Sequence, residues 1–171
     1  CITGSVAAYR SVDLARELIK HGAEVYVVMS DDATKIVHPY TFEWATGNPV
    51  TIEITGKVEH ISLARDSDLV LVAPATANTI AKVAYGIADT SVTLVLSVAL
   101  GYNKPIIFVP AMHGPMYENK VLKEALNRLK EAGIYIVEPK IEEEKAKFPD
   151  IEDIIHEILE ILYPKDLIGH R

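Results

Sequence analysis

The chain has 171 residues, of which 49% are hydrophobic and 24% charged, and its formal net charge is −7. This length predicts one globular domain with a sizeable core, and the acidic balance argues against a broad nucleic-acid-binding face. The longest apolar run, Leu69–Ala75, is shorter than the roughly 20 residues of a membrane-spanning helix. The single cysteine, Cys1, cannot form an internal disulfide, and no signal peptide is visible, so we expect a cytoplasmic location.

Apolar runs and helical patterns alternate along the chain. Helices are expected at Val6–His21, at a broken stretch over Pro39–Gly47, at Thr79–Leu100 with a break near Gly86, at Tyr117–Ala132 and at Ile151–Leu162. Strands are expected at Cys1–Gly4 (the end of one), Glu24–Met29, Asp68–Ala73, Ile106–Val109 and Ile134–Val137, and the longest loop at Pro139–Pro149.

This alternation predicts an α/β fold of three layers, in which a parallel Rossmann-like or flavodoxin-like sheet carries helices on both faces. Ligands of such sheets bind beyond the carboxyl ends of the strands. The segments that follow expected strands are Gly4–Ser5, Ser30 (which can cap a short helix), Pro74–Thr79 and Pro110–Met116.

Gly4 and Ser5 lie between the first strand and the first helix. Gly4 allows a tight turn and a close approach to a ligand, and the free N–H groups of the first helical turn favour an anion or a phosphate. Ser5 could equally be a plain helix cap. The spacing G-x-G-x-x-G is absent, so the usual dinucleotide fingerprint is not present.

The segment Pro74–Thr79 is the most informative one. It offers two hydroxyls, one carboxamide and free backbone N–H groups directly after an apolar strand, and its alanines let a flat or phosphorylated ligand come close. Pro110–Tyr117 combines two methionines, a histidine and a tyrosine, which is typical either of an apolar pocket with a polar tip or of core packing at a helix start.

His60 precedes a predicted helix and is either a surface histidine or an acid/base group. The chain has no Cys/His cluster and no H-E-x-x-H pattern, which argues against a metal site. It also lacks G-x-S-x-G and a P-loop, which argues against the common hydrolases and NTPases.

Five segments in order resemble the flavin-dependent cysteine decarboxylase family, and within it the enzymes that act on phosphopantothenoylcysteine. The resemblance runs from Cys1 to about Leu162. The matching segments are Gly4–Tyr9 (G-S-[IV]-A-A-[YI]), Val58–Ile61 around the histidine, Pro74–Thr79 (P-x-S/T-A-N-T), Gly86–Asp89 (G-x-A/C-D) and Pro110–Tyr117 (P-A-M-N-x-x-M-[WY]).

The resemblance implies that FMN binds noncovalently between the subunits of a homotrimer or larger oligomer. It implies His60 as the active-site histidine, and Met112 and His113 as substrate-binding residues. The implied FMN contacts are Gly4, Ser5, Val6, Ser30, Thr76, Ala77, Asn78, Thr79 and Ala111.

The implied activity is that of a carboxy-lyase. In this family the flavin oxidises the substrate's cysteine thiol, and the carboxylate leaves beside the resulting thioaldehyde, which is an electron sink. The phosphopantothenoylcysteine enzymes then return the hydride, giving 4′-phosphopantetheine for coenzyme A synthesis.

The sequence departs from the family pattern at two points. His113 stands where the family has an asparagine that contacts the substrate carboxylate, and a histidine could make the same contact. The family uses a flap cysteine in the reductive step, whereas Pro139–Pro149 contains none. Either another donor, such as Lys145 or Lys147, supplies the proton, or reduction proceeds differently.

The ends of the sequence read as cut, because no methionine precedes Cys1 and the last residues lack a cap. The segment Pro164–Arg171 resembles the D-L-x-G-[KH]-R stretch that opens the phosphopantothenate–cysteine ligase domain of fused enzymes. We therefore expect a flavoprotein domain over residues 1–163 and, over residues 164–171, the start of a linker to a ligase domain.

Three other interpretations stay open. Flavin prenyltransferases share the fold and an FMN site but lack the histidine segment and the P-A-M motif. A non-catalytic FMN-binding or regulatory subunit would not require His60. A peptide-cysteine decarboxylase stops at the enethiol, which fits the missing flap cysteine.

Overall fold

A parallel sheet forms the centre of the molecule. Strand β1 (Val70–Ala75) pairs with β2 (Ile106–Pro110), which pairs with β4 (Tyr135–Ile136). On the other side of β1, the amide of Ala73 donates to the carbonyl of Cys1 at 3.1 Å. Parallel bridges then join Ile2 to Met29 and Val28 to Thr51. The computed structural model describes residues 1–165.

The order of these segments across the sheet is that of a Rossmann-like, doubly wound fold. Along the chain the segment at Ile2 comes first, Val28–Met29 second, Thr51 third, and β1, β2 and β4 fourth to sixth. Across the sheet the order is third, second, first, fourth, fifth, sixth. The direction of winding therefore reverses between the Ile2 segment and β1, and a crevice opens at such a switch point, outside the carboxyl ends of the strands.

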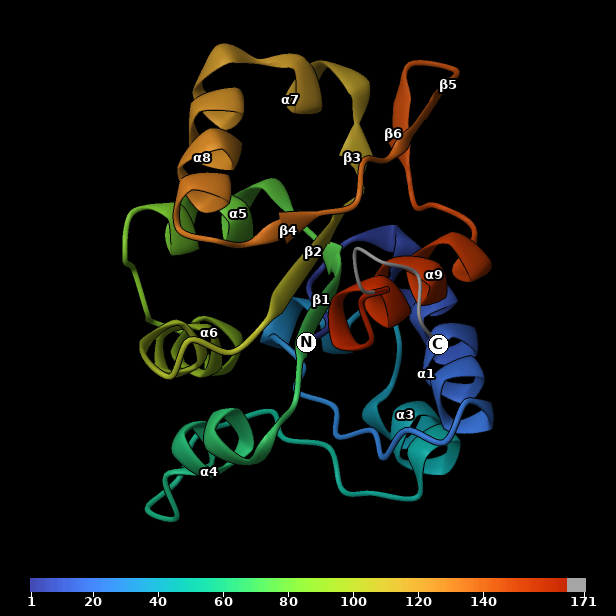
Figure 1. Ribbon diagram of the computed structural model, residues 1–171, viewed down its shortest axis with the longest axis vertical. Coiled ribbons are helices and arrows are strands. Elements are labelled where there is room, and N and C mark those ends of the chain that lie inside the picture. Colours follow the sequence, from blue (N-terminus) through green and yellow to red (C-terminus); the bar gives the residue numbers. More distant parts are fainter. Residues whose placement is uncertain (166–171) are drawn as a thin grey trace.

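Helices cover both faces of the sheet, which confirms the predicted three layers (Figure 1). One face carries α4 (Glu59–Asp66), α5 (Ala77–Ala84), α6 (Ser91–Gly101) and α8 (Lys120–Glu131), and the other carries α1 (Arg10–Lys20) and α9 (Ile151–Leu162). Along β2, Ile106 and Phe108 pack in the core beneath α4, α5, α6 and α8, and Ile107 and Val109 pack in the core beneath α1 and α9. All four are buried, because a strand alternates its side chains between two covered faces.

The remaining elements are short. They are the 3₁₀ turn η1 (Val6–Tyr9), α2 (Asp31–Thr34), α3 (Pro39–Thr46), β3 (Met112–His113), α7 (Gly114–Glu118), β5 (Lys140–Glu142) and β6 (Lys145–Lys147). Among residues 1–165, no helix is long and apolar enough to cross a membrane.

Several predicted elements are confirmed and others need correction. The break near Gly86 separates α5 from α6, and α9 has the predicted bounds. The stretch from Pro39 is a regular helix rather than a broken one, because Pro39 stands in its first turn and Gly47 ends it at a φ of 72°. The predicted helix Tyr117–Ala132 is two helices, since Asn119 has extended backbone and caps α8 through the amide of Leu122.

The predicted strand Glu24–Met29 is paired only at Val28 and Met29. Its earlier part lies outside the ladder, because the carbonyl of Val25 accepts a hydrogen bond from the Asn48 side chain at 2.8 Å. Burial follows the same division, since Glu24 and Tyr26 are exposed while Val28 and Met29 are buried.

The predicted loop Pro139–Pro149 is a β-hairpin. β5 and β6 pair antiparallel, and a two-residue turn, Glu143–Glu144, joins them with φ of 51° and 61°. Both central residues of a type I′ turn need positive φ, which glycine and asparagine adopt far more readily than glutamate. The turn residues therefore gave no hairpin signal in the sequence.

Candidate functional site

A cleft of about 510 Å³ opens at the carboxyl ends of the strands, at the switch point of the sheet. It is lined by the segments that follow the Ile2 strand, the Met29 strand, β1 and β2. The lining residues are Thr3, Gly4, Ser5, Val6, Ser30, Asp31, Asp32, Thr76, Ala77, Asn78, Thr79, Lys82, Thr90, Val92, Thr93, Ala111, Met112, His113 and Met116.

The structure brings together eleven of the twelve site residues predicted from the sequence. Gly4, Ser5, Val6, Ser30, Thr76, Ala77, Asn78, Thr79, Ala111, Met112 and His113 all line this cleft. They come from four separate βα connections, and parallel strands present all such connections at one edge of the sheet.

Thr3, which is 1% exposed, fastens the end of the Ile2 segment to the end of β1. Its hydroxyl donates to the Pro74 carbonyl at 2.6 Å and accepts from the Thr76 amide at 3.1 Å. A buried side chain thus makes both hydrogen bonds that the Pro74–Thr79 segment would otherwise leave unmade. The switch point is thereby held at a fixed width.

Gly4 is required for space rather than for its backbone conformation. The chain turns tightly at Gly4, as expected from the sequence, since the Ser5 amide donates to the Thr3 carbonyl at 2.9 Å, but the φ of Gly4 is not in the left-handed region. A Cβ at this position would lie 2.6 Å from the Cβ of Asp32. The first loop therefore packs directly against the start of α2, which brings Asp31 and Asp32 to the cleft wall.

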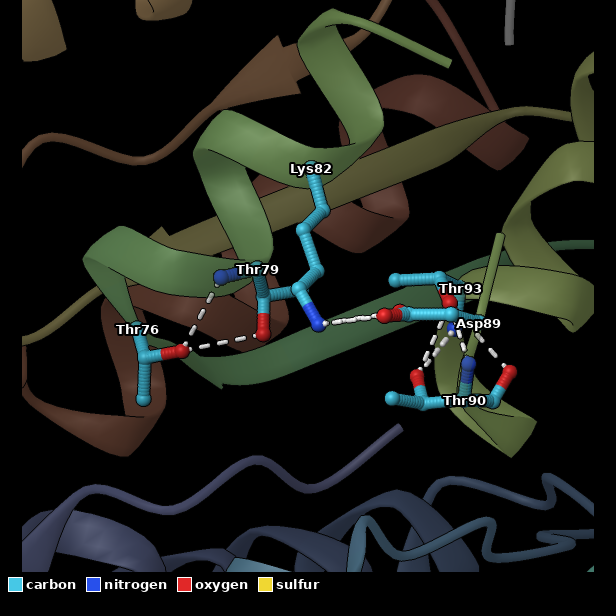
Figure 2. Close-up of polar contacts among 6 residues, drawn as sticks. All are labelled: Thr76, Thr79, Lys82, Asp89, Thr90 and Thr93. Carbon is cyan, nitrogen blue, oxygen red and sulfur yellow. Dashed lines mark hydrogen bonds and ion pairs between the residues drawn. The ribbon is translucent and has the colours of Figure 1, made fainter. Parts of the chain in front are cut away.

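The hydroxyls of the Pro74–Thr79 segment already have partners within the protein. Thr76 caps α5 by accepting from the Thr79 amide at 3.2 Å, and the two threonine hydroxyls are 2.9 Å apart (Figure 2). Asn78 is exposed and takes no part in this capping. Of the three polar side chains in the segment, the Asn78 carboxamide is the one presented to a ligand.

The facing wall comes from α6 and from one turn further along α5. Thr90 and Thr93 form a capping box at the start of α6, and Lys82 donates to both carboxylate oxygens of Asp89 at 2.9 and 3.0 Å (Figure 2). This ion pair joins α5 to the residue before the α6 cap. The first turns of both helices therefore border the cleft, where their N–H groups favour a negatively charged ligand group.

The third wall is β3 and the start of α7. Met112 is half-buried, and His113 is exposed at the N-cap position of α7, where its side chain makes no capping hydrogen bond. The imidazole is therefore uncommitted and borders the cleft. β3 pairs antiparallel with β6, with Met112 opposite Ala146 and His113 opposite Lys145.

Tyr117 links α7 to Glu138, the residue that leads into the β5–β6 hairpin. It is 4% exposed, its hydroxyl donates to the Glu138 carboxylate, and Lys123 lies 3.8 Å from its ring centroid. Burial, together with the hydrogen bond to Glu138, raises the pKa of Tyr117 above its ordinary value. The hydroxyl therefore keeps its proton and remains a donor to the residue that leads into the β5–β6 hairpin.

His60 is the one predicted site residue that does not line the cleft. It lies in the first turn of α4, which packs against α6. Its Nδ1 is buried and has no hydrogen-bond partner among the described residues. A buried ring nitrogen without a partner is costly.

Sequence reasoning missed eight lining residues. They are Thr3, Asp31, Asp32, Lys82, Thr90, Val92, Thr93 and Met116. Helical spacing could have found Lys82, which stands three residues after Thr79 on the same face of α5. The pattern T-x-x-T before an apolar run is a capping signal that could have drawn attention to Thr90 and Thr93.

The sequence profile of the Flavoprotein family matches residues 1–163. The chain belongs to the Flavoprotein family. This confirms the family resemblance predicted from the five motifs. In this flavoprotein the matched region includes every residue of the cleft.

Individual relatives agree with this assignment. The chain is 53% identical to the coenzyme A biosynthesis bifunctional protein CoaBC of Thermococcus kodakarensis, over 99% of the chain and 43% of that protein. It is 39% identical to a probable phosphopantothenoylcysteine decarboxylase of Streptococcus mutans, over 81% of the chain and 80% of that protein. The crystal structure of the FMN-dependent cysteine decarboxylase SpaF superposes with a TM-score of 0.84 at 27% identity, covering 94% of this chain and 93% of that one.

The residues of the cleft fit a flavin mononucleotide. The volume of the cleft, about 510 Å³, lies in the range of small-molecule and cofactor sites, about 300–1,000 Å³. Two helix N-termini suit a phosphate, the alanines at positions 77 and 111 leave room for a flat ring, and Asn78 offers both a donor and an acceptor to ring atoms. Asp31 and Asp32 line the cleft from α2, where carboxylates can accept from hydroxyl groups.

Proposed function

We propose that this flavoprotein catalyses the FMN-dependent decarboxylation of 4′-phosphopantothenoylcysteine to 4′-phosphopantetheine, a step of coenzyme A biosynthesis. The observation that carries the proposal is the convergence of the predicted cofactor and substrate segments on one cleft at the switch point. The names of the relatives at 53% and 39% identity support the substrate.

FMN would be held by two kinds of groups. Backbone N–H groups at the starts of α5 and α6 would bind its phosphate, and Asn78 would hydrogen-bond to the ring. The other proposed contacts are Gly4, Ser5, Val6, Ser30, Thr76, Ala77, Thr79 and Ala111. The bound flavin supplies the reversible two-electron oxidation of the carbon that bears the thiol.

His113 would bind the carboxylate of the substrate. Its imidazole borders the cleft and is free of capping bonds. A neutral imidazole donates one N–H and a protonated one adds charge assistance. Met112 would contribute an adaptable apolar contact beside it.

His60 would act from a neighbouring subunit. Within one chain it lies away from the cleft, and its Nδ1 lacks a partner among the described residues. A homotrimer or larger oligomer in which α4 and α6 of one copy border the cleft of the next would supply the histidine as an acid/base group. The interface would also cover exposed apolar residues, such as Val58 beside His60.

The chain spans 43% of the length of the Thermococcus kodakarensis relative. We propose that residues 1–163 form the decarboxylase domain of a multifunctional cytoplasmic enzyme and that residues 164–171 begin the linker to a ligase domain. Most of this linker, residues 166–171, lies outside the described residues.

A peptide-cysteine decarboxylase is the second candidate, because the peptidyl-cysteine decarboxylase EpiD superposes with a TM-score of 0.83. The identity of 26% to EpiD, against 53% to the bifunctional coenzyme A protein, favours 4′-phosphopantothenoylcysteine as the substrate.

Two measurements test the proposed function. The purified protein should be yellow, or should take up added FMN and bleach on reduction. Incubated with 4′-phosphopantothenoylcysteine, it should release CO₂ and form 4′-phosphopantetheine, identified by mass. A protein that binds no flavin, or that decarboxylates only a cysteine-ended peptide, would contradict the proposal.

A further inference from the structure

Every net decarboxylation must deliver a proton to the carbon that loses its carboxylate, because the balance is R–COO⁻ + H⁺ → R–H + CO₂. If the proposed function is correct and His113 binds that carboxylate, the donor must stand beside His113. The chain should therefore carry a second group with an exchangeable proton at this position.

The strand register brings one such group there. His113 on β3 is directly opposite Lys145 on β6. Directly opposite residues of an antiparallel pair have Cβ atoms about 4.5–5.5 Å apart and point to the same face. Lys145 does not itself line the cleft, but the flexible four-carbon stem of a lysine lets its ammonium group extend toward the atoms that His113 contacts.

The other two lysines of the hairpin are already paired. Lys147 lies 3.2 Å from a carboxylate oxygen of Glu142 and 3.8 Å from one of Glu143, and Lys140 lies 2.7 Å from Asp150. Within residues 1–165, no carboxylate lies within 4.0 Å of the Lys145 ammonium. Lys145 is also exposed, so water can return a proton to it after each turnover.

The position of Lys145 is fixed from both sides. The carbonyl of Glu144 accepts from the Gly114 amide at 2.7 Å, and a Cβ on Gly114 would lie 2.5 Å from that oxygen. Ala146 is 2% exposed in the main core. The two-residue turn with positive φ sets the register, and a slip by one residue would turn Lys145 to the opposite face.

We propose that Lys145 is the catalytic acid that protonates the carbon from which CO₂ departs. The C–C bond to the carboxylate breaks, and its electron pair passes through the former Cα into the thiocarbonyl group, giving an enethiolate. That carbon then forms a C–H bond with a proton of the Lys145 ammonium, which becomes an amine. Bound flavin would supply both the two-electron oxidation of the sulfur-bearing carbon and its later reduction, so no other oxidant or reductant is consumed.

The test follows product and flavin in single turnovers of the flavin-loaded protein under anaerobic conditions. Lys145→Met keeps most of the apolar stem and removes the proton. It should form the unsaturated thiol, two hydrogens lighter than 4′-phosphopantetheine, and leave the flavin bleached. We expect formation of the saturated product to fall by about 10²-fold or more, as for loss of a general acid.

Two matched variants complete the test. Lys147→Met removes a paired lysine of the same hairpin, and it should give saturated product with reoxidised flavin. His113→Asn should react more slowly and still give saturated product. Saturated product from Lys145→Met at the wild-type rate, or the unsaturated thiol from either matched variant, would overturn the role of Lys145. A wild-type protein that neither releases CO₂ nor bleaches its flavin would instead reject the proposed function on which this role rests.

Discussion

Replacing Thr3 by valine should separate the two loops that form the switch point. Valine keeps the shape of threonine but has no hydroxyl, so the Pro74 carbonyl and the Thr76 amide lose their shared partner. Thr3 is 1% exposed, so water does not readily replace it. Leaving buried polar groups unmatched costs about 1–3 kcal/mol each, and we expect Thr3→Val to lower the free energy of unfolding by about 2–3 kcal/mol.

The assay is thermal unfolding of the flavin-free protein, followed by circular dichroism at one fixed protein concentration. For a domain of this size each kcal/mol shifts Tm by about 2–4 °C, so Tm should fall by about 4–12 °C. Flavin binding should weaken as well, because loss of the hydrogen bond from the Thr76 amide to Thr3 frees the Pro74–Thr79 segment to move. Thr3→Ser keeps the hydroxyl and removes only a methyl group, so it should retain most of both properties.

The reasoning is refuted if Thr3→Val melts within about 1 °C of the wild type, since one net hydrogen bond, worth about 1 kcal/mol, should already be visible on this scale. It is equally refuted if Thr3→Ser loses as much stability as Thr3→Val. In that case the methyl group, rather than the hydroxyl, would be the stabilising part of the side chain.

Three further predictions concern the hairpin and the two histidines. The double variant Glu143→Asn/Glu144→Gly should raise the free energy of unfolding by about 1 kcal/mol, because non-glycine residues at positive φ cost about 1–2 kcal/mol each. The control, Glu143→Gln/Glu144→Gln, removes the same charges and should not raise Tm. His60→Asn should lower turnover about 10²-fold or more while FMN absorbance after gel filtration is retained; turnover near that of the wild type would reject an acid/base role. His113→Ala should raise KM or lower kcat with FMN still bound, and His113→Asn should recover much of the activity; a variant that loses Tm but keeps its kinetics would show that His113 only packs.

The sequence by itself determined the features that depend on neighbouring residues. Apolar strands alternating with capped helices predict a covered parallel sheet, and short polar segments after the strands predict where a ligand binds. These signals are local, because caps, turns and apolar runs act within a few residues. The segments Gly4–Ser5, Pro74–Thr79 and Ala111–His113 could therefore be identified and assigned to one edge before any distance was known.

Tertiary structure alone decided how those segments meet. The reversal of winding between the Ile2 segment and β1 comes from long-range pairing, and the contact that requires Gly4 is with Asp32 on another element. The hairpin that sets Lys145 opposite His113 was invisible because Glu143 and Glu144 hold positive φ without a turn-forming residue. His60 is separated from the cleft because α4 packs against α6 rather than beside β3. Contacts between distant residues depend on the packing of whole elements, and no local pattern records them.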